Sequence, residues 1–103
     1  MENLKFEFPG GASPLPPGKP YVVVGVVASS NLEVMAERKE LGGKCKFEVA
    51  TTAAGFAETW KAVLQDFMER KKPRDVQFSI NDFAAIAPIV SLRLDQAWEQ
   101  LTD

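Results

Sequence analysis

Apolar and polar residues alternate in several short stretches of the chain, which is the pattern of β-strands with one buried face. Segments of this kind cover residues 4–8, 32–37, 44–50 and 76–80. Segment Tyr21–Ala28 is instead almost continuously apolar and β-branched. This is typical of a strand covered on both faces, or covered on one face by the protein and on the other by a partner. Gly25 in this segment indicates a bulge or a close backbone approach. The pattern predicts about five strands.

The outward side chains of two of these segments carry opposite charges. Glu33 and Glu37 lie on the first, and Lys44 and Lys46 lie on the next one along the chain. Opposite charges that face each other across two strands stabilise the pair. We therefore expect these two strands to be neighbours.

A following segment has the apolar spacing of an α-helix. Its apolar face comprises Phe56, Trp60, Val63, Leu64 and Phe67. Thr51 or Thr52 is placed to cap the start of this helix, and Asp66 and Arg70 have the spacing of a helical ion pair. Pro73 cannot continue the hydrogen-bond ladder, so we expect the helix to end before it.

A second helical pattern begins near Pro88, a residue type favoured at the first position of a helix. Its apolar face comprises Val90, Leu94, Ala97, Trp98 and Leu101. Asn81 and Asp82 are turn-forming residues. We expect them to end the preceding strand and to cap the segment that leads to this helix.

The element order is therefore β-β-β-β-α-β-α, in a single domain of residues 1–103. Two amphipathic helices on one face of a largely antiparallel sheet bury the apolar faces of both. We predict an α+β two-layer sandwich. Aromatic residues are expected to fill the layer between sheet and helices: Trp60, Phe67, Phe78 and Trp98.

Segment Pro9–Pro20 contains five prolines and three glycines, so it is neither a helix nor a central strand. An exposed, semi-stiff loop is the plain interpretation. A PxxP ligand running from Pro14 to Pro17 is the alternative.

Charge and cysteine content restrict the classes of function. The formal net charge is −2, and basic residues are scattered among acidic ones, which disfavours nucleic-acid binding. Cys45 is the single cysteine, so we expect no disulfide, a reducing cytoplasmic setting and a buried thiol on a strand. No signal peptide pattern is visible, and Tyr21–Ala28 is too short to cross a membrane.

One turn holds the best candidates for a reactive or modified side chain. The chain has no histidine and no metal-ligand spacing, but the turn Ala28–Asn31 holds the hydroxyls of Ser29 and Ser30. A serine without a neighbouring base is a poor nucleophile, whereas on a turn it is accessible to an enzyme that attaches a group. Serine and asparagine are also ordinary turn residues, so an attachment site and a plain turn both stay open here.

Four blocks of the sequence carry a family resemblance. They are L-x-F-x-F-P at Leu4–Pro9, V-G-V-V-A-S-S-N-L-E-V at Val24–Val34, T-T-x-x-G-F-A-x-x-W at Thr51–Trp60 and I-N-D-F-A-A-x-A-P-x-V-x-L-R-L-D-Q-A at Ile80–Ala97. Together they resemble the acyl carrier (delta) subunit of biotin-independent malonate decarboxylase. The resemblance spans nearly the whole chain. The acyl carrier subunit of citrate lyase is a more distant relative that shares mainly the serine turn.

This resemblance implies that Ser29 carries 2'-(5''-phosphoribosyl)-3'-dephospho-CoA through a phosphodiester. The family has glycine, glycine and aspartate where this chain has Ala28, Ser30 and Asn31. The resemblance further implies a non-catalytic carrier, not an enzyme, within a multi-subunit complex for malonate degradation. The second hypothesis is that this chain is a plain interaction subunit of the same complex, with the same fold, to which the arm is never attached. An independent hydrolase using Ser29 is the third, which the absence of histidine disfavours.

The resemblance also implies the partners. An acetyl/malonyl transferase (alpha) subunit exchanges acetyl for malonyl on the arm, and the beta and gamma subunits decarboxylate the malonyl thioester. A prosthetic-group transferase and a malonyl-CoA transacylase complete the set. Candidate docking residues are Asn31, Asp82, Phe83 and Arg93. A cap at Asp82 and a solvated surface charge at Arg93 are the plainer interpretations.

Overall fold

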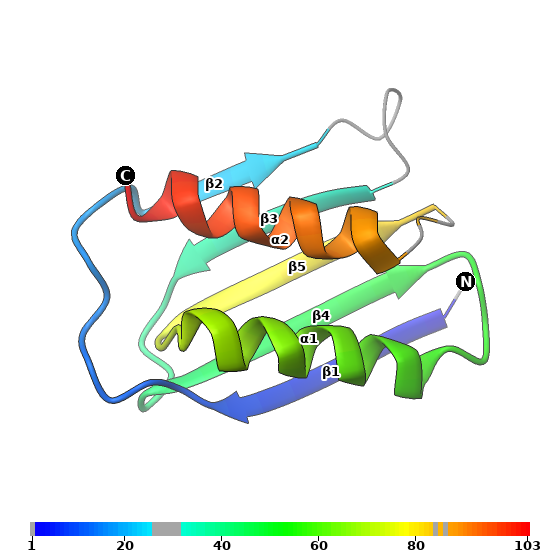
Figure 1. Ribbon diagram of the computed structural model, residues 1–103, viewed down its shortest axis with the longest axis horizontal. Coiled ribbons are helices and arrows are strands. Elements are labelled where there is room, and N and C mark those ends of the chain that lie inside the picture. Colours follow the sequence, from blue (N-terminus) through cyan, green and yellow to red (C-terminus); the bar gives the residue numbers. More distant parts are fainter. Residues whose placement is uncertain (1, 26–31, 84, 86) are drawn as a thin grey trace.

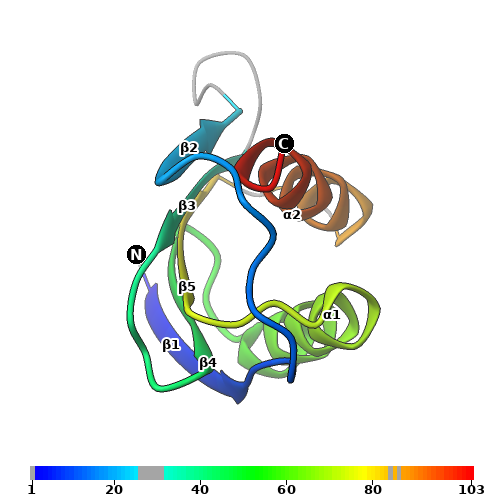
Figure 2. The same ribbon diagram turned by 90° about the vertical axis from the view of Figure 1, so that its left-hand side faces the viewer.

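The structure, a computed structural model, describes residues 2–25, 32–83, 85 and 87–103. Its strands are β1 (Glu2–Pro9), β2 (Tyr21–Val24), β3 (Leu32–Arg38), β4 (Lys44–Thr51) and β5 (Val76–Asp82), and its helices are α1 (Ala57–Lys71) and α2 (Ala87–Leu101). Both helices cover one face of a five-stranded sheet (Figures 1 and 2). The predicted α+β two-layer architecture and the element order are confirmed.

The strand order in the sheet is β1-β4-β5-β3-β2. All neighbouring strands are antiparallel except β4 and β5, which run parallel. A parallel pair needs a crossover connection, and α1 supplies it (Figure 1). The returning strand β5 therefore enters between β4 and β3, with α1 over the β1 side of the sheet and α2 over β3 and β2.

The predicted pairing of Glu33 and Glu37 with Lys44 and Lys46 is wrong, because β5 separates β3 from β4. The two lysines instead lie across from β1. Their Nζ atoms are 3.0 and 3.7 Å from the carboxylate oxygens of Glu7. Complementary charges on consecutive strands therefore do not predict which strands are neighbours when a strand that follows a crossover helix inserts between them.

A cluster of aromatic rings forms the centre of the core. Phe47 of β4 and Phe78 of β5 stack with their ring centroids 4.9 Å apart. Phe67 of α1 and Phe8 of β1 meet Phe47 edge-on, at 6.3 and 5.7 Å. The residues expected to face the core are buried or packed against it: Leu4, Leu32, Val34, Ala36, Cys45, Val49, Trp60, Val63, Leu64, Val76, Ile80, Val90, Leu94, Ala97, Trp98 and Leu101.

The start of α1 differs from the prediction. The helix begins at Ala57, and its N-cap residue Phe56 makes no side-chain capping bond. Thr51 belongs to β4 and Thr52 follows that strand, so neither threonine is the cap. Phe56, expected on the buried face, is half exposed. Its spacing to Trp60 is helical, although Phe56 itself precedes the helix.

The end of α1 and its ion pair agree with the prediction. Lys72 closes the helix in the left-handed region, with φ of 49°, directly before Pro73. Nε of Arg70 lies 2.8 Å from Oδ2 of Asp66, and its Nη1 lies 2.9 Å from Oδ1 of Asp95 in α2. The hydrogen bonds that Arg70 donates to the carboxylates of Asp66 and Asp95 raise its pKa. The Arg70–Asp95 ion pair joins the two helices at the surface.

Strand β2 is an edge strand that the protein covers on one face only. Val22 and Val24 are buried on the side of α2, whereas Tyr21 and Val23 are 58% and 50% exposed. The apolar run that includes β2 therefore does not form a central strand. The other interpretation of that run, a face covered by a partner, stays a prediction.

The loop predicted at Pro9–Pro20 runs from one edge of the sheet to the other, across the end of the molecule where both helices terminate (Figure 2). Nη1 of Arg74 donates to the carbonyl oxygen of Gly11 at 3.3 Å. Further along the loop, Nη2 of Arg38 donates to the carbonyl oxygen of Pro16 at 2.7 Å. The loop is exposed, as predicted, but two arginines fasten it across the open end of the sandwich.

Candidate functional site

Ser29 and Asn31 lie outside the described residues, so the strands on either side define the site. β2 and β3 pair antiparallel, with Val24 opposite Val34. Ser29 is midway along the chain between these two paired residues. The predicted hairpin is confirmed in its two strands, which form one edge of the sheet.

Asp82 ends β5 beside the root of this hairpin. It lies across from Leu32, the first residue of β3, and is only 3% exposed. The hydroxyl of Thr51 donates to its Oδ2 at 2.7 Å, and the backbone N–H of Ala85 donates to its Oδ1 at 2.9 Å. The predicted cap before α2 is confirmed. Asn81 and Asp82 end β5, as expected, but both residues belong to the strand and not to a turn after it.

The other two candidate docking residues have different surroundings. Phe83 follows Asp82 directly and is exposed. Arg93 lies within α2, where its Nη1 donates to Oε1 of Gln96 at 2.9 Å. Nε of Arg93 is buried and has no hydrogen-bond partner among the described residues, and the side chain as a whole is partly exposed. The fold brings Asp82 and Phe83 to the hairpin root. The docking roles of these residues stay predictions.

Sequence reasoning missed the position of Thr51. The alternation of inward residues in β4 runs through Cys45, Phe47 and Val49, and the next inward position is Thr51. A polar side chain at an inward position needs a buried hydrogen-bond partner. The inward position of Thr51 therefore indicates a buried partner such as the carboxylate of Asp82. The preference of threonine for helix N-caps favoured the other interpretation.

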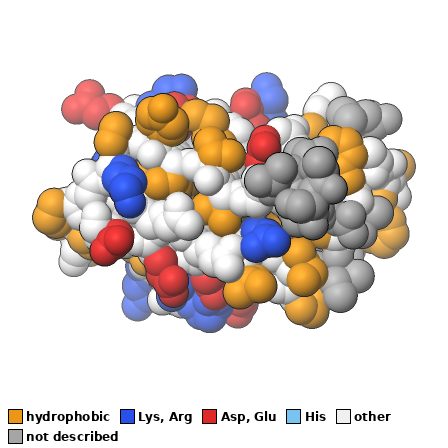
Figure 3. Space-filling view, turned by 90° about the horizontal axis from the view of Figure 1, so that it is seen from above, with side chains coloured by type: hydrophobic (Ala, Val, Ile, Leu, Met, Phe, Trp, Pro, Cys, Tyr) orange, Lys and Arg blue, Asp and Glu red, His pale blue; other side chains and the backbone are white. Residues whose placement is uncertain are grey.

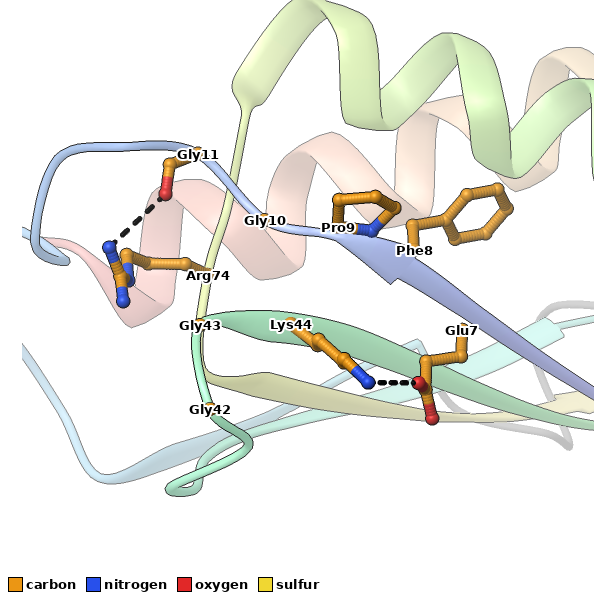
Figure 4. Close-up of a pocket in the computed structure, with 9 residues that line it drawn as sticks. All are labelled: Glu7, Phe8, Pro9, Gly10, Gly11, Gly42, Gly43, Lys44 and Arg74. Atoms are coloured by element: carbon orange, nitrogen blue, oxygen red, sulfur yellow. Dashed lines mark hydrogen bonds and ion pairs between the residues drawn. The ribbon is translucent and has the colours of Figure 1, made fainter.

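A hollow of about 570 Å³ lies at the opposite end of the sheet, beside the start of the Pro9–Pro20 loop (Figure 4). Nζ of Lys44 is 3.0 Å from the carboxylate of Glu7, and this contact lowers the pKa of Glu7. Arg74 points to the carbonyl oxygen of Gly11. Each charged group that lines the hollow is already paired, so the hollow carries no reactive group of its own.

Two other kinds of site are absent from the described part of the chain. No group of three or more histidine, cysteine or acidic side chains there is placed to hold a metal ion. Cys45 is fully buried in β4, and burial raises the pKa of its thiol, so the thiol is unreactive, as predicted. None of the helices in the described ranges has the length and apolar content needed to span a membrane.

Comparisons with known proteins agree on one family. The family model of the malonate decarboxylase delta subunit (MdcD) matches residues 19–101. A malonate decarboxylase acyl carrier protein of Xanthomonas campestris pv. campestris (strain B100) is 50% identical over 103 residues, which cover 98% of this chain and 95% of the relative. A protein of the same name from Bradyrhizobium diazoefficiens is 43% identical, with 100% of this chain and 97% of the relative covered.

A solved structure shares the fold. One chain in the crystal structure of a Pseudomonas malonate decarboxylase hetero-tetramer in complex with malonate superposes with a TM-score of 0.83 at 36% sequence identity. The match covers 98% of this chain and 99% of that chain. The similarity therefore extends over the hairpin, the sheet and both helices.

Proposed function

This chain belongs to the acyl carrier (delta) subunit family of malonate decarboxylase, and we propose that it carries acetyl and malonyl thioesters on a 2'-(5''-phosphoribosyl)-3'-dephospho-CoA arm attached to Ser29. It is a carrier of a multi-subunit complex rather than a catalytic subunit. The observation that carries the proposal is the position of Ser29, midway between the paired residues Val24 and Val34 in a chain similar to carriers along its length.

The residues around the hairpin fit a bulky phosphodiester. β2 is an edge strand with β3 as its one described neighbour in the sheet, so the outer edge of the hairpin is open in the described part of the chain. For attachment, the carrier has to supply only an accessible serine hydroxyl, whose oxygen becomes part of the phosphodiester. The neighbouring carboxylate of Asp82 is occupied by Thr51 and Ala85, so it holds the hairpin root and leaves proton transfer to the attaching enzyme.

When attached, the arm supplies a thiol whose thioesters stabilise the carbanion formed on decarboxylation. The carrier contributes a tether. A tethered group reaches an effective concentration on the order of millimolar at each active site within its reach. The fold contributes a rigid base to this tether, because the β2–β3 pair is fixed to β5 and α2 through buried side chains.

The partners we propose act on the arm and its acyl group one after another. An alpha subunit exchanges acetyl for malonyl and releases acetate, and the beta and gamma subunits release carbon dioxide and restore the acetyl form. A prosthetic-group transferase attaches the arm, and a malonyl-CoA transacylase is a further proposed partner. A chain whose single cysteine is buried and unpaired suits the reducing cytoplasm.

Intact mass measures the attachment directly. After co-expression with the prosthetic-group transferase, the wild-type carrier should gain a single adduct of the mass of the arm, and Ser29→Ala should gain none. Ser30→Ala is the matched control and should be modified as the wild type is. An unshifted wild-type mass, in an assay that modifies another carrier of the family, would contradict the proposal.

A second function stays a candidate because Ala28, Ser30 and Asn31 replace the family's glycine, glycine and aspartate. In it the chain is an interaction subunit of the same complex and never receives the arm. This alternative predicts normal assembly and equal activity of complexes that contain the Ser29→Ala carrier.

A further inference from the structure

The sheet face opposite the helices divides into two unlike halves. On β1 and β4 the outward side chains neutralise one another. Lys5 lies 3.9 Å from Glu48, and Glu7 lies 3.0 Å from Lys44 and 3.7 Å from Lys46. This half presents paired charges to solvent and is complete without a partner.

On β2 and β3 the outward side chains have a different composition. Val23 lies opposite Met35, and Tyr21 lies opposite Glu37. Glu33 accepts a hydrogen bond from Nδ2 of Asn81 at 3.3 Å. Neither Glu33 nor Glu37 forms an ion pair with a described residue. This half therefore combines an apolar centre with carboxylates that lack a cation.

The exposure of the apolar centre is large for an edge strand. Tyr21 and Val23 are 58% and 50% exposed, and Figure 3 shows hydrophobic side chains at the surface on the side that carries β2. Edge strands of free proteins usually carry charges or proline that discourage pairing. Inward burial of Val22 and Val24 already holds β2 on the core, so the fold itself does not need Tyr21 and Val23 to be apolar.

We propose that this surface, the outer hairpin face formed by Tyr21, Val23, Glu33, Met35 and Glu37, docks the carrier on another subunit of malonate decarboxylase. The partner surface has an apolar centre bordered by lysine or arginine side chains. Tyrosine and aliphatic anchors surrounded by polar groups are the composition of a binding hot spot. The two carboxylates without ion pairs select a basic border and set the orientation of the carrier.

The inference rests on the proposed carrier function, because the docking face and Ser29 belong to one hairpin. Val24 and Val34 form the next pair after Val23 and Met35 along the strands toward Ser29. A subunit seated on the outer hairpin face thus fixes the strands from which the arm departs. Docking at this place limits the region that the arm searches.

Binding to malonate decarboxylase purified without its carrier subunit tests the docking face. All carriers in the assay have Ser29→Ala, so the arm does not contribute to affinity. Val23→Lys puts a positive charge at the apolar centre and should weaken Kd by about 10-fold or more. Leu92→Lys is the matched control, because Leu92 on α2 is 49% exposed; it should change Kd by less than about 2-fold. Equal unfolding temperatures show that both variants fold.

The charge component has its own pair of variants. Glu37→Lys should weaken Kd by about 5-fold at low salt, with the effect shrinking as salt screens the interaction. Glu99→Lys, an exposed reversal on α2, should have no effect. This pair also keeps the proposal testable if Val23→Lys does not fold.

Two results would overturn the docking face. One is equal affinity of the Val23→Lys and Leu92→Lys carriers for the complex. The other is a wild-type carrier dimer that Val23→Lys dissociates while affinity for the complex stays unchanged, which would make the face a contact between two copies of the carrier. Failure of arm attachment is read separately, from the mass of carriers that retain Ser29, so the two proposals fail independently.

Discussion

Buried and outward side chains alternate in both halves of the open sheet face, but the outward side chains differ in their chemistry. β1 and β4 direct lysine and glutamate outward and pair them with each other. β2 directs Tyr21 and Val23 outward, and their side chains are 58% and 50% exposed. Beside them, the glutamates of β3 form no ion pair with a described residue. The comparison teaches that alternation decides which face of a strand is buried. The chemistry of the outward side chains decides whether a pair of strands satisfies its own charges or is left with an exposed apolar surface that a partner can cover. The incomplete half is the one that carries the serine hairpin.

The comparison extends to the inner face, where β4 and the edge strand β2 contribute unequally to the core. Phe47 of β4 contacts rings from three other elements, among them Phe78 at 4.9 Å. β2 contributes two valines, Val22 and Val24. We therefore regard the aromatic cluster around Phe47 as the stable base of the fold and the β2 edge as the part adapted to partners.

The largest predicted effect breaks this base. Phe47→Ala should lower the free energy of unfolding by about 3–5 kcal/mol, because it removes a ring from the centre of the aromatic cluster. Val24→Ala, on the inner face of β2, should cost about 1–2 kcal/mol. Urea unfolding of both variants provides the measurement. Equal losses would contradict the unequal division of the core.

A smaller effect is expected where β4 and β5 end beside the hairpin root. Thr51→Val keeps the shape of the side chain but removes the hydroxyl that donates to Asp82. A buried carboxylate oxygen without its donor should cost about 1–3 kcal/mol. Thr52→Val, at an exposed position, is the matched control. If both variants unfold at the same urea concentration, the Thr51–Asp82 bond does not stabilise this corner.

The next effect concerns the loop that joins the two edges of the sheet. The guanidinium of Arg38 donates to the backbone carbonyl oxygens of Lys19, Pro16 and Leu101 at 2.7, 2.7 and 2.9 Å. Arg38→Ala should cost about 1–2 kcal/mol and should increase amide hydrogen exchange at Lys19, whose N–H donates to Leu101. Lys39→Ala should leave exchange at Lys19 unchanged. Unchanged exchange in Arg38→Ala would show that the arginine does not fasten the loop.

The smallest effect tests the paired charges of the β1–β4 half. The pKa of Glu7 is lowered from 4.5, chiefly by its hydrogen bond with Lys44. A lowered pKa means that its contribution to stability is present above pH 4.5 and is lost as pH falls through the folded-state pKa. Glu7→Gln should therefore lower the unfolding temperature slightly at pH 7, and the difference from wild type should vanish in acid.

The control for this prediction is Glu37→Gln on β3. Glu37 has no ion pair among the described residues, so its replacement should change the unfolding temperature less than Glu7→Gln does at pH 7. A larger change in unfolding temperature for Glu37→Gln than for Glu7→Gln would contradict the view that charges are paired on the β1–β4 half of the sheet face and unpaired on the β2–β3 half.

The sequence predicts those parts of the fold that local periodicity determines. Inward residues such as Phe47 and Leu94 follow from the strand and helix periods. The strand order does not follow, because insertion of β5 between β3 and β4 depends on the path of the α1 crossover, which leaves no local mark on Glu33 or Lys44. The anchoring of the loop by Arg38 and Arg74 joins residues far apart in sequence, and periodicity carries no information about it.

The site was predictable to a different degree. The apolar run before Ser29 and the alternation after it predict a hairpin, which β2 and β3 confirm. The choice of Ser29 over Ser30 depends on family resemblance, because both hydroxyls occupy the same turn. The Thr51–Asp82 bond was hidden since each residue has a strong alternative preference, for a helix cap and for a turn.

Malonate turnover by the reconstituted complex tests the central claim most directly, namely that Ser29 on the β2–β3 hairpin carries the acyl group. Complexes are assembled with wild-type, Ser29→Ala or Ser30→Ala carrier after exposure to the prosthetic-group transferase, and carbon dioxide release from malonate is measured. The account predicts that the Ser29→Ala complex assembles but releases none, while Ser30→Ala matches wild type. Release at the wild-type rate from the Ser29→Ala complex would contradict the account.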